Sequence, residues 1–89
     1  MDKKKKVYVF SAKWCGPCKT YKPVFDAAMG DYPGMESRYI DIDEESELTS
    51  EHKIRSVPTT IVFADDVEVF RETGTLDEVD LAKAIENHG

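Results

Sequence analysis

Apolar residues in the first half of the chain follow two strand-like patterns with a helix-like pattern between them. Residues 7–10 are all apolar and are β-branched or aromatic, which predicts a strand buried on both faces. Residues 39–43 alternate between polar and apolar side chains, which predicts a second strand. Residues 15–29 carry apolar side chains at helical spacing, which predicts a helix; these side chains are Cys18, Tyr21, Phe25, Ala28 and Met29.

A hairpin is predicted further along the chain. Residues 59–63 and 67–70 are rich in β-branched and aromatic side chains, as strands are. Asp65 and Asp66 lie between these two segments, at a spacing that suits a short turn. We therefore expect the two segments to pair as antiparallel strands.

Two further helices are predicted, one from a weak pattern and one from a strong pattern. Residues 44–54 are weakly amphipathic, and their only clear apolar anchors are Leu48 and Ile54. Thr75 and Glu78 have the spacing of a capping box, which predicts that a helix begins there. One apolar stripe follows this start and predicts the buried face; it consists of Val79, Leu81, Ala82 and Ile85.

The predicted element order is β-α-β-α-β-β-α, which is typical of an α/β fold. We expect a four-stranded mixed sheet with helices on both faces, in which the early strands are parallel and the last strand is antiparallel. The 89 residues suffice for one domain, so residues 1–89 are expected to form a single unit around one core.

Charge and terminal sequence exclude several classes of partner. Acidic residues number 18 against 12 basic ones, and the net charge of −6 disfavours nucleic acid and anionic membrane surfaces. The lysines at positions 3–6 predict a solvated basic tail over residues 1–6. The apolar run after them is far shorter than a signal peptide or a membrane span requires, so we expect a cytoplasmic protein.

Cys15 and Cys18 are the residues with the clearest chemistry. Cytoplasmic thiols are kept reduced, so a pair of cysteines three residues apart is explained better by redox or metal chemistry than by a permanent crosslink. A structural zinc site needs four ligands, and only His52 and His88 could add to the pair, so we expect no metal or other cofactor.

The predicted position of this pair favours redox chemistry. Cys15 lies at the N-terminal edge of the predicted helix, where unpaired N–H groups and the helix dipole favour a thiolate, and Cys18 lies one turn further on. Cys15 is therefore expected to be the nucleophile. Gly16 leaves room for a partner's backbone, Pro17 suits the first turn, and Trp14 is expected to contribute to the docking surface. The acidic residues from 41 to 47 are interpreted as a solvated strand end and helix start.

Three segments resemble the thioredoxin family, over about residue 7 to the end of the chain. Residues 14–19 read Trp-Cys-Gly-Pro-Cys-Lys, with Pro23 five residues after the second cysteine. Residues 54–59 read Ile-Arg-Ser-Val-Pro-Thr and resemble the family's cis-proline segment, which faces the cysteines. The resemblance implies a thioredoxin-like fold, a cis bond between Val57 and Pro58, substrate pairing with the Val57 backbone, and a place for Gly74 near the substrate groove.

Three features depart from the family pattern. The leading strand and helix of the family have no counterpart before the motif. Val9 stands where thioredoxins usually carry a buried aspartate that helps to deprotonate the second cysteine, and Tyr39 stands near the position of a common lysine. Asp66 replaces a glycine of the hairpin, which affects the turn rather than the chemistry.

The resemblance implies a protein-disulfide reductase. The Cys15 thiolate would attack a protein disulfide, and Cys18 would resolve the mixed disulfide. A flavin-containing thioredoxin reductase would then regenerate the dithiol, and the protein would act as a monomer. Two alternatives remain: a glutaredoxin-like reductant that depends on glutathione, suggested by residues 73–77, and a non-redox binding subunit of a larger assembly.

Overall fold

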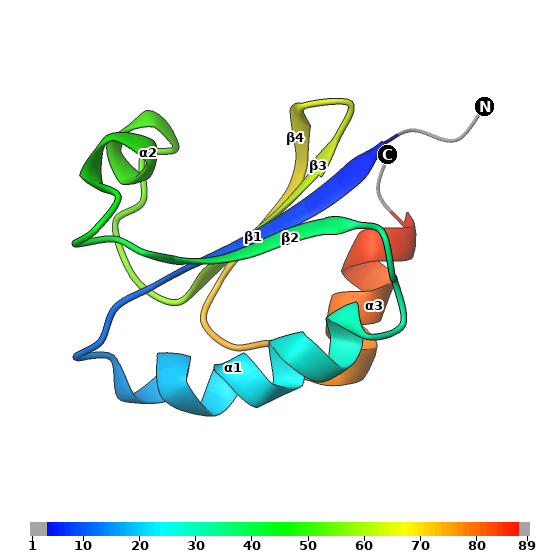
Figure 1. The fold of residues 1–89 in the computed structure, drawn as a ribbon, viewed down its shortest axis with the longest axis horizontal. Helices are drawn as coiled ribbons and strands as arrows, with labels where there is room; N and C mark the ends of the chain where they lie inside the picture. Colours follow the sequence, from blue (N-terminus) through cyan, green and yellow to red (C-terminus); the bar gives the residue numbers. More distant parts are fainter. Residues whose placement is uncertain (1–3, 88–89) are drawn as a thin grey trace.

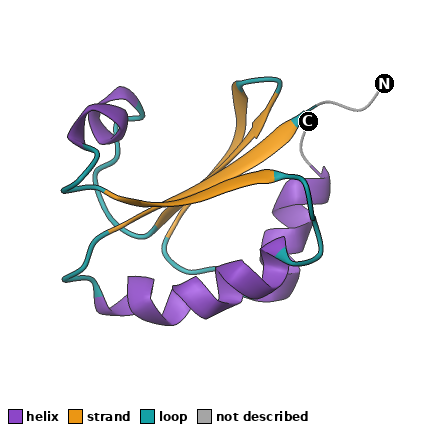
Figure 2. Cartoon of the chain, in the orientation of Figure 1, coloured by secondary structure: helices purple, strands orange, loops and turns teal. Residues whose placement is uncertain are grey.

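The computed structural model describes residues 4–87 and has the predicted order of elements (Figures 1 and 2). The α/β fold class is thus confirmed. The seven elements are β1 (Lys5–Ser11), α1 (Gly16–Met29), β2 (Glu36–Asp41), α2 (Ser46–Glu51), β3 (Thr59–Ala64), β4 (Val67–Thr73) and α3 (Glu78–Asn87).

The four strands form one mixed sheet in the order β2-β1-β3-β4. Strands β1 and β2 are parallel, whereas β3 is antiparallel to both β1 and β4, so the parallel relation expected of the early strands holds for the first two only. The register explains the difference. Asp41 at the end of β2 pairs with Ser11 at the end of β1. Thr59 at the start of β3 pairs with Phe10, which also lies near the end of β1. The segment between β2 and β3 therefore begins and ends at the same end of the sheet, beside the last residues of β1. Strand β3 must therefore run back from that end.

Helices cover both faces of the sheet, as predicted. In Figure 1, α1 and α3 lie on one face and α2 lies on the other. Alternation along β1 supplies both cores, because Val7 and Val9 point toward α1 and α3 while Tyr8 and Phe10 point toward the face that carries α2. The larger core lies under α1 and α3 and includes Tyr21, Phe25, Ala28, Val62, Leu81, Ala84 and Ile85.

Strand β1 begins two residues before the predicted start, so the prediction of a solvated tail is wrong for Lys5 and Lys6. The Lys5 ammonium donates to the carbonyl of Ile85 at 2.6 Å. The Lys6 ammonium lies 3.1 Å from the Asp66 carboxylate and 5.1 Å from the ring centre of Tyr8. Each ammonium group ends on a partner from a distant part of the chain. The spacing of apolar residues cannot reveal such contacts. Residues 1–3 of the predicted tail lie outside the described part of the chain.

Three other elements have bounds that differ from the sequence pattern. Strand β2 runs from 36 to 41 rather than from 39 to 43, because its parallel pairing with β1 extends over polar residues at the sheet edge. Helix α2 covers only 46–51 of the predicted 44–54. Strand β4 continues to residue 73 along β3, three residues beyond the predicted end. Backbone pairing with the neighbouring strand decides the ends of β2 and β4.

The predicted hairpin joins β3 and β4 through Asp65 and Asp66 and is confirmed. Both residues have positive φ, 51° and 68°, as a two-residue turn that matches the twist of the strands requires. Aspartate tolerates this region better than most residues, so the turn forms without glycine.

Helix α3 begins later and buries a different stripe than the sequence pattern predicts. The Asp80 N–H donates to the Asp77 side chain at 2.7 Å, so Asp77 rather than Thr75 caps the helix. The buried face consists of Leu81, Ala84 and Ile85, whereas Val79 is 62% exposed. Leu81, Ala84 and Ile85 follow the i, i+3, i+4 spacing of one helix face, whereas Val79 lies on another side of the helix.

Candidate active site

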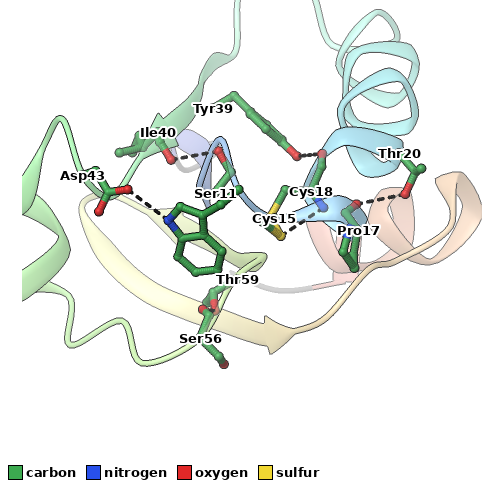
Figure 3. Close-up of a disulfide and its surroundings, with 11 residues drawn as sticks. Ser11, Cys15, Pro17, Cys18, Thr20, Tyr39, Ile40, Asp43, Ser56 and Thr59 are labelled. Carbon is green, nitrogen blue, oxygen red and sulfur yellow. Dashed lines mark hydrogen bonds between the residues drawn. A yellow bond between two sulfur atoms is a disulfide. The ribbon is translucent and has the colours of Figure 1, made fainter.

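A disulfide joins Cys15 and Cys18 at the start of α1 (Figure 3). Their Cα atoms lie 5.3 Å apart, within the range that a disulfide spans without backbone movement. The Cys15 N–H donates to the carbonyl of Ala12, which closes the loop from β1 into the helix. Cys15 and Cys18 are 5% and 2% exposed, and Ala12, Ile42 and Val57 pack against them. The pair is therefore held at the surface end of the core.

The helix start favours negative charge on Cys15. Cys15 is the N-cap residue of α1, and its sulfur accepts a hydrogen bond from the Cys18 N–H at 3.2 Å. Pro17 occupies the first turn, and no acidic residue lies there whose negative charge would disfavour a nearby thiolate. A thiolate at this sulfur gains from the N–H donor and from the positive end of the dipole.

Trp14, next to Cys15 in the chain, is 69% exposed. Its side chain is held by Asp43, a contact that the sequence analysis did not predict. Its indole N–H donates to the Asp43 carboxylate at 3.1 Å. Asp43 is exposed, as the interpretation of the acidic residues as solvated expects, and it has the additional role of holding the Trp14 indole. The ends of the parallel strands β1 and β2 meet at one sheet edge, and this proximity was the signal that could have predicted the contact.

The loop before β3 faces the disulfide, as the resemblance implies. The peptide bond between Val57 and Pro58 is cis, which confirms the expectation, and Val57 packs against the cysteines. The Gly74 N–H donates to the Pro58 carbonyl at 2.8 Å, so the end of β4 lies beside this loop. Gly16 and Pro17 are exposed at the helix start, whereas Pro58 is buried. The helix start, the loop before β3 and Gly74 are called the rim of the candidate site below.

Gly74 and Gly16 provide a matched test of backbone strain at this rim. A Cβ added at either position meets no atom within 4 Å, but only Gly74 has positive φ, 98°. We expect Gly74→Ala to lower the free energy of unfolding by about 1–2 kcal/mol, because a side chain is unfavourable in the left-handed region. Gly16→Ala should change the same quantity by about 0.5 kcal/mol or less.

Urea denaturation of the oxidised variants measures both effects. Equal losses for the two alanine variants would contradict the assignment of the effect to the φ angle.

Tyr39 reaches the second cysteine from β2, a contact that the sequence analysis did not predict. Its hydroxyl donates to the Cys18 carbonyl, and its ring packs on Phe25, with ring centres 5.5 Å apart. Burial is the main cause that raises the pKa of Tyr39 to about 12, so the hydroxyl keeps its proton at neutral pH. Val9, at the position where the family usually carries an acid, is fully buried among apolar residues.

Of the two histidines that were weighed as metal ligands, His52 does not join the cysteines. His52 packs its ring on Tyr8, Phe10 and Phe63 on the opposite side of the sheet from α1. His88 lies outside the described residues. Between residues 4 and 87 the structure has no group of three or more histidine, cysteine or acidic side chains that could hold a metal ion. In the same range, every helix is too short or too polar to cross a membrane.

Comparisons with known proteins agree with this geometry. The family model described as Thioredoxin matches residues 1–87. A thioredoxin from Chlamydia trachomatis is 38% identical over 79 residues, which cover 89% of this chain and 78% of the relative. A thioredoxin from Staphylococcus saprophyticus is 39% identical over 80 residues, 89% of this chain and 77% of the relative.

Solved structures match over nearly the whole chain. A mutant thioredoxin from Halobacterium salinarum superposes with a TM-score of 0.86 at 34% identity, covering 97% of this chain and 75% of that chain. Thioredoxin from Fasciola hepatica gives a TM-score of 0.87 at 30% identity, covering 99% of this chain and 84% of that chain. The fold around the cysteine pair is therefore the fold of these proteins.

Proposed function

Because the chain belongs to the thioredoxin family, we propose that it reduces protein disulfides with Cys15 as nucleophile and Cys18 as resolving thiol. The coarser function follows from the family and the paired cysteines: the protein is a thiol–disulfide oxidoreductase. As in its family in general, its substrates are proteins and a reductase supplies its electrons. The single observation that carries the finer proposal is the position of Cys15 at the N-cap of α1, with its sulfur accepting the Cys18 N–H.

The proposed exchange takes place in two displacements. The Cys15 thiolate attacks one sulfur of a substrate disulfide, forms a mixed disulfide and releases the other substrate sulfur as a thiolate. Cys18 then loses its proton and attacks the Cys15 sulfur, which releases the second substrate sulfur and leaves the Cys15–Cys18 disulfide. The two cysteines give up two electrons, and the substrate disulfide accepts them.

The rim around the disulfide is proposed to dock the substrate. The cis-proline loop leaves the Val57 backbone available to an extended chain, because Pro58 has no N–H and Gly74 already binds the Pro58 carbonyl. The exposed indole of Trp14, fixed by Asp43, offers a flat apolar contact next to the nucleophile. The proposed substrate-binding residues are Trp14, Gly16, Pro17, Val57, Pro58 and Gly74.

The cellular setting is part of the same proposal. We infer that the protein acts in the cytoplasm as a monomer, and that residues 1–89 work as a single domain. The electron donor is proposed to be a thioredoxin reductase rather than glutathione, because Gly16 and Pro17 between the cysteines and the similar proteins favour thioredoxin over glutaredoxin. The protein is proposed to need no metal or other cofactor of its own.

Reduction of insulin disulfides by dithiothreitol tests the proposed function. The wild-type protein should accelerate the precipitation of insulin chains well above the uncatalysed rate, because a preformed thiolate at Cys15 attacks faster than a free thiol. Glu47→Gln, which removes a carboxylate from α2, should keep the full rate. A wild-type rate equal to that of dithiothreitol alone would contradict the proposal.

A further inference from the structure

Cys18 must lose a proton during the second displacement, yet its side chain is shielded from bulk water. The residue is 2% exposed and lies in the first turn of α1. Val9 on the neighbouring strand is apolar and cannot accept a proton. Ile42 and Val57, which pack against the cysteine pair, carry no titratable group either. The proton must therefore leave by a route that the apolar contacts of Cys18 do not provide.

A shallow cavity that is open to solvent provides such a route on the β2 side of the cysteine. It has a volume of about 370 Å³ and is lined by Cys18 together with residues of the β1–α1 loop, α1 and β2. Water occupies roughly 30 Å³ per molecule in the liquid, so the cavity has room for several molecules. The small side chains of Ser11 and Ala12 leave this space open beneath the helix start.

Only one side chain of the cavity lining is an anionic proton acceptor. Lys13, Lys19 and Lys22 also line it, but a lysine ammonium donates hydrogen bonds and accepts none. The Tyr39 hydroxyl stays protonated and donates a hydrogen bond to the Cys18 carbonyl, so it is not a proton acceptor. The remaining titratable side chain of the lining is the carboxylate of Asp41.

Two other carboxylates near the cavity are already paired with lysines. The Lys22 ammonium holds both oxygens of Asp26 at 2.7 and 2.8 Å, and the Lys13 ammonium lies 2.9 Å from the Glu44 carboxylate. Neither carboxylate is part of the cavity lining. These pairs leave Asp41 as the carboxylate that shares the cavity with Cys18.

Asp41 is also held in place at the end of β2. Its Oδ1 atom accepts the N–H groups of Asp43 at 2.8 Å and of Glu44 at 3.3 Å. In the part of the chain that the structure describes, protein hydrogen bonds reach Oδ1 only, so Oδ2 remains available to water. The backbone thus fixes one oxygen and leaves the other for proton transfer.

We propose that Asp41 accepts the proton of Cys18 through water in this cavity, and that it thereby serves as the base for the resolving step. The proposal rests on the exchange described under Proposed function. The Cys18 S–H bond breaks, a bridging water takes the proton and passes one of its own to Asp41, and the Cys18 electron pair forms the bond to the Cys15 sulfur. The bond between Cys15 and the substrate sulfur breaks in the same displacement, and the substrate sulfur leaves as a thiolate. Asp41 returns its proton to solvent through the same cavity.

Asp41→Asn isolates this role, because the asparagine carbonyl oxygen can still accept the two backbone N–H groups while the basic oxygen is lost. Reduced protein is mixed in a stopped-flow spectrometer with an excess of 5,5′-dithiobis(2-nitrobenzoic acid), and each displacement releases one coloured thiolate. The first phase reports attack by Cys15 and depends on reagent concentration, and the second phase reports resolution by Cys18 and does not.

We expect Asp41→Asn to leave the first phase unchanged and to slow the second phase at pH 7 by about tenfold, below the typical 10²–10⁴-fold effect of a general base because cavity water still accepts protons. The slowed phase should recover as the pH rises. It should also recover with added formate, which is small enough to enter the cavity and supplies a carboxylate, whereas the wild-type phase should not respond.

Glu47→Gln is the matched control, because it removes a carboxylate six residues away that does not line the cavity. Its second phase should equal that of the wild type. A second phase of Asp41→Asn with the wild-type rate and pH profile would overturn the role of Asp41, as would a slowed phase that formate does not restore. The wild-type protein tests the proposed function separately. Two phases in the wild type would support that function even if Asp41 has no role, whereas the absence of both phases in the wild type would count against it.

Discussion

Cys18→Ser is expected to remain joined to its protein substrate by a disulfide from Cys15. The variant keeps the N-cap sulfur and its place at the helix start, so the first displacement proceeds. A serine hydroxyl does not resolve the mixed disulfide, which should then persist for roughly minutes to hours, the time scale of uncatalysed disulfide rearrangement. Mass spectrometry and non-reducing gels should show a covalent complex whose disulfide dithiothreitol reduces.

Cys15→Ser is the control for this experiment. It retains Cys18, but that residue is buried one turn inside the helix and lacks the N-cap position. We expect no trapped complex and no insulin reduction above the uncatalysed rate. Trapping by Cys15→Ser in place of Cys18→Ser would show that the two roles are reversed.

Leu81→Ala is expected to lower the free energy of unfolding by about 2–5 kcal/mol, as cavity-forming substitutions of buried leucine do. Leu81 is completely buried in the core between the sheet, α1 and α3. A small domain has only about 5–15 kcal/mol of stability in total, so the loss would be a large part of it. Urea denaturation of the oxidised protein measures the change.

Val79→Ala is the matched control, because it shortens an apolar side chain on the same helix at a position that is 62% exposed. We expect it to change the free energy of unfolding by about 0.5 kcal/mol or less. Equal effects at the two positions would contradict the packing of α3 through the stripe that begins at Leu81.

Element types could be predicted from the amino-acid pattern because they depend on neighbours in sequence. The helical spacing from Cys18 to Met29 and the β-branched residues on either side of Asp65 are local features, and the structure places α1 and the β3–β4 hairpin there. Boundaries depend on partners elsewhere in the chain. Lys5 and Lys6 read as a tail, yet pairing with Phe63 and Ala64 makes them part of β1.

The same distinction applies to the end of the chain. Thr75 and Glu78 have the spacing of a capping box, but the side chain that caps α3 is that of Asp77. Val79, which the sequence analysis grouped with Leu81, is exposed because residues two apart lie roughly 200° from each other around a helix. Local spacing identified the helix, and packing on the sheet selected its buried face.

The cysteine pair and its chemistry were readable from the sequence, because a nucleophile at a helix start requires only residues adjacent in the chain. The contacts that surround the pair join residues that are distant in sequence: Trp14 with Asp43, Cys18 with Tyr39, and Pro58 with Gly74. The cavity shared by Cys18 and Asp41 exists only because β1, β2 and α1 meet at one sheet edge. The position of the nucleophile could be predicted because it depends on consecutive residues. The contacts and the cavity around the cysteine pair could not, because they depend on strand register, which long-range pairing alone decides.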